Sequence, residues 1–381
     1  MRQTVLQIVR KPVCWIGFLL LPLFCMFFLT DMMDSGLPAQ VPAGLVDRDG
    51  TEISREISQT LGSMQMVSIE EVPESYTAAR KLVQEGKIYG FFLIPENFQS
   101  DLLAGRRPVI TFYTNMTYYV PASLLFKTFK ATALYSKAGI AVQVIQSAGG
   151  ASIGGDPSAM LQPINIAARG IGNPWLNYGI YLCNSFVPCV MQLMIMLMTC
   201  YLLGEEIKKG RSRRLLEMGG GSIVKVVTGK LLPQTIIWWV LIIFMEAWLF
   251  RYNHFPIHGS WFWITLSELM FVLACQGMGL FIISLLPNLR LSLSVSALTG
   301  ILSFSIAAFS FPEQSMYGGI SIFSWIMPIR YNFLIYIDQA LNGRELYYSR
   351  IWYVAYIVYM VLPLTMLWKL KRDYRQMVYA P

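Results

Sequence analysis

Charged side chains gather in one segment of the second half of the chain, between two long apolar runs. The segment extends from Leu203 to Lys230 and begins with the acidic pair Glu205 and Glu206. Its remaining candidate contact residues are Gly210, Arg211, Arg213, Arg214, Leu215, Leu216 and Glu217. Arginines at a rim and leucines at a centre suit an interface with a soluble partner protein. The acidic pair is either salt-bridged at that interface or solvated at the end of a helix.

Residues that could bind a metal or act as nucleophiles are poorly placed for either task. The six cysteines all lie in apolar segments: Cys14, Cys25, Cys183, Cys189, Cys200 and Cys275. This placement excludes a disulfide framework in the polar region and a recognisable cysteine metal site. His254 and His258 are four residues apart, but Pro256 disfavours the helix that would bring them together. We therefore expect neither a metal site nor an enzymatic activity on this chain.

Two glycine-containing stretches are candidates for phosphate-binding loops, and neither fits. The stretch from Gly149 to Pro157 lacks the Gly-Lys-Ser/Thr ending of such a loop. Gly229-Lys230 is followed by Leu231, where Mg²⁺ coordination requires serine or threonine. If the chain works with ATP, hydrolysis takes place on another polypeptide.

Composition predicts a polytopic α-helical membrane protein. Apolar residues make up 55% of the 381 residues, charged residues only 14%, and the mean hydropathy is +0.49. Soluble domains carry about a quarter charged residues. Six apolar stretches are predicted to span the membrane: 13–30, 180–203, 231–250, 261–286, 291–311 and 351–370. The net charge of +8 does not indicate nucleic acid, because the basic residues lie at the ends of these stretches.

The basic residues also predict the orientation of the chain. The N-terminus holds three, the segment from Lys208 to Lys230 seven, the turn at Arg290 one and the C-terminal tail four, fifteen in all. The short segments on the other side hold four: Arg251, Arg330, Arg344 and Arg350. Because cytoplasmic loops are enriched in lysine and arginine, both termini are predicted to be cytoplasmic.

Residues 31–174 form a long polar region between the first two predicted spans. Strands are expected at 41–46, 66–69, 89–94 and 109–113, and helices at 51–61, 75–85, 95–103 and 119–146. Alternating strands and helices predict an α/β extracytoplasmic domain. We therefore expect three domains. Residues 1–30 hold the cytoplasmic N-terminus and the first span, and residues 31–174 form the domain outside the membrane. Residues 175–381 hold the other five spans, a cytoplasmic loop at 204–230 and an outer hairpin at 312–349.

Polar residues within the predicted spans are few. Glu246 is predicted near the outer end of its span, at headgroup level, whereas Glu268 lies about two turns into its span. A carboxylate at that depth usually faces protein or water, so a structural hydrogen bond and substrate contact both remain open. Asn184, Gln192, Ser303 and Ser305 either bond neighbouring helices or line a path.

The order of these features resembles the permease subunits of ABC-2 type transporters, and most closely the bacterial drug-efflux-like branch with a large domain between the first two helices. The resemblance covers nearly the whole chain. It rests on Val46-Asp-Arg-Asp-Gly-Thr51, Gly86-Lys-Ile-Tyr-Gly-Phe-Phe-Leu-Ile-Pro95, Gly204-Glu-Glu-Ile-Lys-Lys-Gly210, Gly229-Lys-Leu-Leu-Pro233, and Phe309-Ser-Phe-Pro312 with Met327-Pro-Ile-Arg-Tyr331. Arg211 and Arg213 stand where the family usually has threonine and an acidic residue, which indicates a contact specific to this chain's own partner.

The resemblance implies roles for three sets of residues. The charged segment would couple the chain to an ATPase. Asn184, Gln192, Glu268, Ser303 and Ser305 would line the substrate path, because the second and fifth helices line it in the family. The outer gate and re-entrant hairpin would hold Phe311, Pro312, Trp325, Pro328, Arg330 and Tyr331, although the aromatic residues also suit an interfacial belt.

The resemblance further implies a bacterial inner-membrane exporter that works by alternating access. Expected partners are two ABC ATPase subunits, which hold the ATP and Mg²⁺, a second permease copy, membrane lipids, and a periplasmic adaptor with an outer-membrane channel. No cofactor is expected on this chain. The alternative is a membrane scaffold or signalling component that transports nothing and binds an envelope partner through its outer domain.

Overall fold

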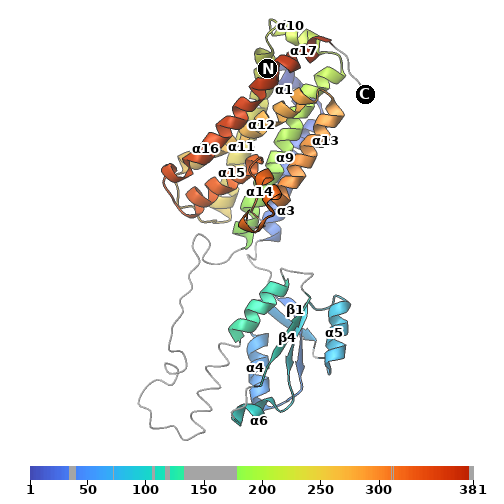
Figure 1. Cartoon of the computed structure of the whole chain (residues 1–381), viewed down its shortest axis with the longest axis vertical. Helices are drawn as coiled ribbons and strands as arrows, with labels where there is room; N and C mark the ends of the chain where they lie inside the picture. Colours follow the sequence, from blue (N-terminus) through green and yellow to red (C-terminus); the bar gives the residue numbers. More distant parts are fainter. Residues whose placement is uncertain are drawn as a thin grey trace. The chain divides into compact units, whose positions relative to one another are not determined.

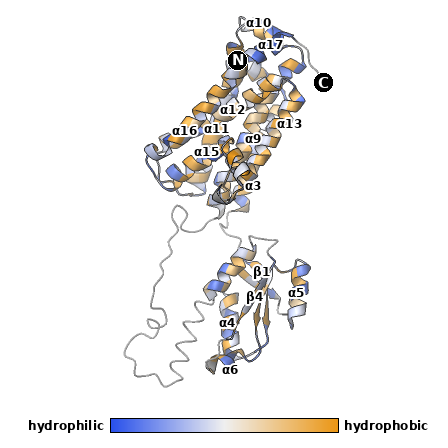
Figure 2. Ribbon diagram, viewed as in Figure 1, coloured by the Kyte–Doolittle hydropathy of each residue, from blue (hydrophilic) through white to orange (hydrophobic). Residues whose placement is uncertain are grey.

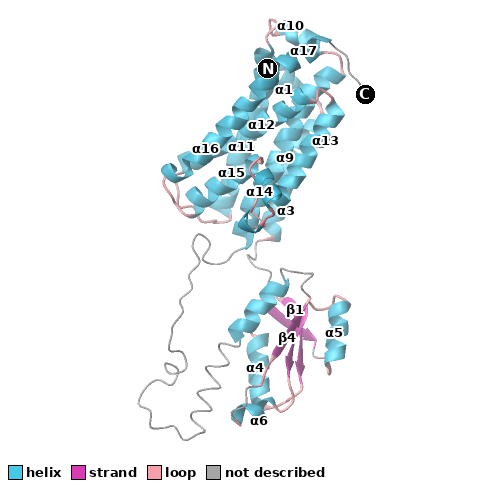
Figure 3. Cartoon of the chain, viewed as in Figure 1, coloured by secondary structure: helices cyan, strands magenta, loops and turns pink. Residues whose placement is uncertain are grey.

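The computed structural model describes residues 1–33, 40–71, 73–104, 108–115, 121–132, 178–309, 311 and 313–376 of the chain. Internal contacts divide the chain into two units. One is a helix bundle within Met1–Gly36 and Gly170–Pro381, and the other is an α/β unit within Leu37–Arg169. Among the described residues, every strand belongs to the α/β unit (Figure 3).

Six helices of the bundle are long and apolar enough to cross a membrane, and Figure 2 shows their predominantly apolar colouring. The first combines α2 (Pro12–Trp15), the π-helical turn η1 (Ile16–Leu20) and α3 (Leu21–Met32). The others are α9 (Tyr178–Lys208); α11 (Ile223–Ala247) with η2 (Trp248–Tyr252); α12 (Trp261–Leu285); α13 (Leu289–Ile306); and α16 (Leu346–Val361) with η5 (Leu362–Met366) and α17 (Leu367–Gln376). The prediction of a polytopic helical membrane protein is therefore confirmed.

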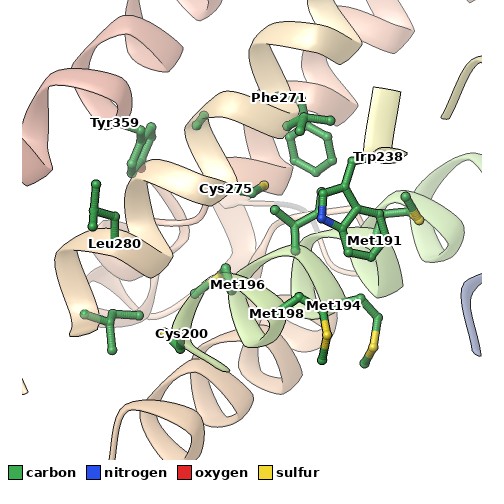
Figure 4. Close-up of a cluster of buried hydrophobic side chains, with 14 of the residues drawn as sticks. Met191, Met194, Met196, Met198, Cys200, Trp238, Phe271, Cys275, Leu280 and Tyr359 are labelled. Carbon is green, nitrogen blue, oxygen red and sulfur yellow. The ribbon is translucent and has the colours of Figure 1, made fainter. Parts of the chain in front are cut away.

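The core of the bundle forms where α9 packs against α12 and α13. Figure 4 shows Met191 of α9 beside Trp238 of α11, with Phe271 of α12 next to the indole. Flexible thioether side chains fill the irregular space between the helices. Glycine allows the closest helix approach, because a Cβ on Gly277 would lie 2.2 Å from the carbonyl oxygen of Tyr359 in α16.

The charged segment is more helical than the sequence predicted. We expected a loop at 204–230 and a third span from 231. Instead, α9 continues to Lys208, a short helix α10 covers Ser212–Met218, and α11 begins at Ile223. The predicted ends of the two helices were wrong because they were placed where the continuous apolar residues stop and start. Lys225 and Lys230 can extend along a helix toward its end without breaking it.

The segments at the two ends of the bundle are distinct. Helix α1 (Arg2–Arg10), α10 and α17 lie at one end, where Thr4 Oγ1 donates to the carbonyl oxygen of Gly229 (Figure 1).

Beyond α13 come η3 (Glu313–Ser315), α14 (Gly318–Ser324), α15 (Pro328–Ile335) and η4 (Tyr336–Leu341). The axis bends by 77° between α14 and α15, as in a broken span or a re-entrant loop. Pro328 occupies the first turn of α15, where its missing N–H costs no hydrogen bond.

The α/β unit contains one four-stranded sheet in the order β2-β1-β3-β4. The strands are β1 (Val41–Asp47), β2 (Val67–Glu71), β3 (Gly90–Ile94) and β4 (Thr111–Thr114); β1 is parallel to β2 and β3, and β4 is antiparallel to β3. The labelled helices are α4 (Glu52–Gly62), α5 (Tyr76–Gln84) and α6 (Phe98–Leu103), and residues 121–132 are also helical. Ser75 caps α5 by accepting a hydrogen bond from Ala78 N at 3.2 Å. The rest of the helix expected at 119–146, and the stretch from Gly149 to Pro157, lie outside the described residues.

Candidate functional site

The two acidic residues that end α9 are enclosed by basic and amide side chains from other helices. Glu205 pairs with Lys11, which precedes α2, and with Lys209 at 2.7 Å, and it accepts from Gln7 Nε2 of α1 at 2.5 Å. Glu206 pairs with Lys230 of α11 at 2.7 Å and with Arg211 at 3.2 Å. We call these seven residues the charged belt: Gln7, Lys11, Glu205, Glu206, Lys209, Arg211 and Lys230.

Burial makes the charged belt energetically significant. Glu205 and Glu206 are 5% and 6% exposed and Lys230 is 2% exposed, so the acidic pair is not solvated. Lys230 Nζ donates to both Glu206 Oε1 and Gln7 Oε1 at 2.7 Å. A buried charge without its partner is strongly destabilising, whereas an intact, hydrogen-bonded pair is tolerated. The belt therefore holds α1, α9 and α11 in one arrangement.

Tyr374 connects the same region to the last helix. Its hydroxyl donates to the carbonyl oxygen of Leu203 in α9 at 3.0 Å, and its own carbonyl oxygen accepts from Ser212 Oγ of α10 at 3.1 Å. Its side chain is fully buried. Through Tyr374, α17 is therefore hydrogen-bonded to both α9 and α10.

Gly210 makes the turn from α9 into α10. Its φ is +64°, a left-handed conformation that glycine adopts without strain. Arg211 N donates to the carbonyl oxygen of Glu206 at 2.9 Å, the hydrogen bond expected of a Schellman C-cap. The role of Gly210 in this structure is thus to end α9 and re-aim the chain.

The outward surface of α10 differs in one respect from the prediction. Arg211, Arg213, Arg214 and Glu217 line this surface, and Arg213 pairs with Glu217 at 3.2 Å. Leu215 is half-buried, and Leu216 is only 4% exposed and belongs to the core of the bundle. The expectation that Leu216 meets a partner is therefore wrong, because the helical period turns it toward the bundle. Met218, 61% exposed, is the large apolar side chain that α10 presents outward.

The candidate path residues separate into different environments. Gln192 Nε2 donates to Ser303 Oγ at 2.8 Å, and Gln192 Oε1 accepts from Ile329 N at 2.8 Å. Both side chains are fully buried, an arrangement typical of hydrogen bonding between helices. Ser305 lies on the exposed face of α13, away from them.

Asn184 and Glu268 line a different cavity, inside the bundle. Asn184 Nδ2 donates to the Tyr336 hydroxyl at 2.5 Å, and Glu268 Oε1 accepts from Asn332 Nδ2 at 2.6 Å. Glu246, predicted at headgroup level, is 8% exposed and lines the same cavity. Its enclosure could not be predicted, because sequence position alone does not show which helix face is enclosed, and its depth in the membrane stays a prediction.

The hairpin residues form a compact polar cluster. Arg330 is buried, pairs with Glu313, donates to Ser324 Oγ at 2.6 Å and lies 3.7 Å from the Trp325 ring centroid. The Tyr331 hydroxyl donates to the carbonyl oxygen of Trp325 at 2.7 Å. Arg330 thus joins α15 to the segment before α14. Phe311 is exposed, and Pro312 lies outside the described residues.

Glu313 is ionised in this cluster. Burial by itself would raise the pKa of its carboxyl group. Hydrogen bonds from Trp325, Arg330 and Ser321 and the charge of Arg330 outweigh burial and lower the pKa below its ordinary value. Glu313 therefore supplies the negative charge that a buried arginine requires.

Sequence reasoning did not select Gln7, Lys11, Lys230, Glu313 or Tyr374. Lys230 was counted among the basic residues of the charged segment and considered beside Gly229 as a phosphate motif, but not as part of a buried ion pair, although a lysine within an apolar helix is itself a signal that a partner is nearby. The others carry no local pattern. Among the described residues, no three histidine, cysteine or acidic side chains are placed to hold a metal ion.

Comparison with known families identifies the chain. A search of curated proteins gives no match. A family model described as ABC-2 family transporter protein matches residues 13–368, which cover the six candidate spans apart from Pro12 and the last residues of α17. Members of this family are membrane components of transporters, are not themselves catalytic and associate with an ATPase subunit. The chain is thus a multi-pass membrane protein that belongs to the ABC-2 transporter family.

Proposed function

We propose that the chain is the permease of an ABC exporter and that a separate ATPase docks on the exposed surface of α10. The observation that carries this proposal is the charged belt. Arg211, half-exposed at the base of α10, pairs with the buried Glu206 of α9, and the buried Lys230 joins Glu206 to α11 and, through Gln7, to α1. A soluble protein that moves α10 would thereby move the spans. The docking surface consists of Arg211, Arg213, Arg214, Glu217 and Met218.

The division of labour on this surface follows from exposure. Met218 is the apolar anchor, and the arginines form a charged rim around it. Buried apolar anchors contribute most of the energy of an interface, whereas rim charges mainly alter the association rate and its salt dependence. The Arg213–Glu217 pair is exposed and contributes little to the stability of α10 itself.

Transport would proceed by alternating access. ATP and Mg²⁺ would be held by the ATPase, and closure of two ATPase subunits would press α10 and re-orient α9, α11 and α17 through the charged belt and Tyr374. A second permease copy would pack against the bundle, and the exposed apolar stripe of α13, with Leu291, Leu298 and Ile301, is a suitable face.

The membrane position forms part of the same proposal. The end with α10 would be cytoplasmic and the α/β unit periplasmic in a bacterial inner membrane, supported by the excess of basic residues in the segments at the α10 end. An adaptor and an outer-membrane channel are compatible with a periplasmic domain. The substrate would be a drug-like, lipid or other envelope compound.

Co-purification with the cognate ATPase tests the docking proposal. Met218→Glu should lower the amount of ATPase retained by at least about tenfold, since an anchor of this kind contributes about 1.4 kcal/mol or more. Phe323→Glu, comparably exposed on α14, is the matched control and should retain the ATPase. Equal retention by the two variants would remove α10 as the docking element.

A further inference from the structure

A small cavity inside the bundle is lined by two carboxylates from different helices. Glu246 comes from α11 and Glu268 from α12, and the other polar lining side chains are Asn184, Ser267, Asn332 and Tyr336. The remaining lining residues are apolar or aromatic, among them Ile242, Met245 and Phe271. The cavity shares no residue with the charged belt.

The carboxylates are only partly satisfied by the protein. Glu268 Oε1 accepts from Asn332 Nδ2, but Glu246 Oε2 is buried and has no hydrogen-bond partner among the described residues. Buried polar atoms in native proteins are almost always paired, so an unpaired carboxylate oxygen that borders a cavity points to a ligand there.

The surroundings provide no positive charge to balance the pair. Within the described part of the chain, the lining residues include no lysine, arginine or histidine. Apart from Glu246, the titratable groups within electrostatic reach of Glu268 include the Cys275 thiol of α12 and the Tyr353 and Tyr356 phenols of α16, and Tyr336 of η4 lies at the cavity wall. Thiols and phenols supply no positive charge. Two uncompensated carboxylates within a bundle would cost several kcal/mol each, so a cation is required.

The size of the cavity limits what that cation can be. Its volume of about 40 Å³ admits a few water molecules or a small ion, far less than a drug-sized ligand occupies. A proton needs no coordination shell, and an alkali-metal ion gives up its hydration water more readily than the divalent ions do, of which magnesium usually keeps several waters. We propose that Glu246 and Glu268 form a binding site for one small monovalent cation, either a proton or an alkali-metal ion.

Thermal unfolding of the purified full-length chain in nanodiscs tests the site. Melting temperatures are compared between about pH 5 and pH 9 in choline, sodium and potassium chloride at constant ionic strength. A proton that binds the folded state more tightly than the unfolded state adds stability at low pH and is lost as the pH rises. If the ligand is a proton, the three salts give the same decline; if it is a metal ion, sodium or potassium restores a few degrees Celsius at high pH.

The variants Glu246→Gln and Glu268→Gln keep the shape of the cavity and remove its charge. Each variant should show a smaller change of melting temperature with pH or with the metal ion. Glu345→Gln, an exposed position at the start of α16, is the control and should respond as the wild type does. A response that is the same in both cavity variants and the wild type overturns the proposal.

A measurement on the wild type alone covers the case in which the variants fail to fold. The infrared carbonyl band of a protonated carboxyl group should be present at neutral pH if the ligand is a proton. Absence of that band, together with a melting temperature indifferent to sodium and potassium, also overturns the proposal.

Discussion

Replacing Lys230 with methionine tests whether the charged belt holds the bundle together. Methionine keeps most of the volume of the side chain but removes its charge. The change leaves Glu206, 6% exposed, without its buried partner and deprives Gln7 Oε1 of a donor at 2.7 Å. Breaking a buried pair costs about 3–5 kcal/mol. Arg211 still contacts Glu206 at 3.2 Å from a half-exposed position, so the lower end, about 3 kcal/mol, is expected.

The measurement is thermal unfolding of the full chain in nanodiscs. A loss of about 3 kcal/mol corresponds to a fall in melting temperature of roughly 6–12 °C for a unit of this size. Arg213→Met is the matched control, because it breaks the exposed pair with Glu217, which is worth about 0–1 kcal/mol. Combining Lys230→Met with Glu206→Gln should recover most of the loss, since no buried charge then remains unpaired. Equal melting temperatures for Lys230→Met and Arg213→Met would refute the reasoning.

Three further predictions concern other parts of the chain. Gly277→Ala should destabilise the bundle by about 1–3 kcal/mol in the same unfolding assay, because its Cβ meets a backbone oxygen, whereas Gly318→Ala, with open space around it, should not. Glu313→Gln should lower the melting temperature at neutral pH, and the difference from wild type should vanish as the pH falls through the lowered pKa of Glu313; a difference that grows in acid would contradict this. Ser100 and Arg213 are both exposed, so each can be replaced by cysteine and tested in intact spheroplasts with a thiol reagent that does not cross the membrane. The reagent should label Ser100→Cys but not Arg213→Cys, with labelling of the unmodified chain as the background. Labelling of Arg213→Cys alone would show the opposite orientation.

The membrane spans and most elements of the α/β unit could be predicted because their signals are local. About twenty apolar residues or a short β-branched run reveal a helix or strand without knowledge of its neighbours. The glycine turn at Gly210 and the serine cap at Ser75 are local features too, since each acts within one turn of its own backbone, although Gly210 was predicted as a partner contact and not as a turn. The start of α11 was missed because Lys225 and Lys230 mask a helix that continues through them.

The partners within the candidate site could not be predicted, because they meet only in three dimensions. Gln7 and Lys230 are separated by 223 positions, and Tyr374 and Leu203 by 171. The buried carboxylate pair depends on which faces of α11 and α12 turn inward, and both helices are so uniformly apolar that their sequences define no inward face. Leu216 illustrates the same limit, since a leucine in a charged helix suits either a partner or the chain's own core.

Photo-crosslinking in native membranes tests the central claim, that an ATPase drives this permease through α10. A photoreactive phenylalanine analogue replaces Met218, and in a second variant Tyr317, which is 82% exposed in the segment that precedes α14. This probe avoids the native cysteines. We predict that position 218 crosslinks to the cognate ATPase and that position 317 does not. Crosslinking of the ATPase from position 317, with none from position 218, would contradict the account.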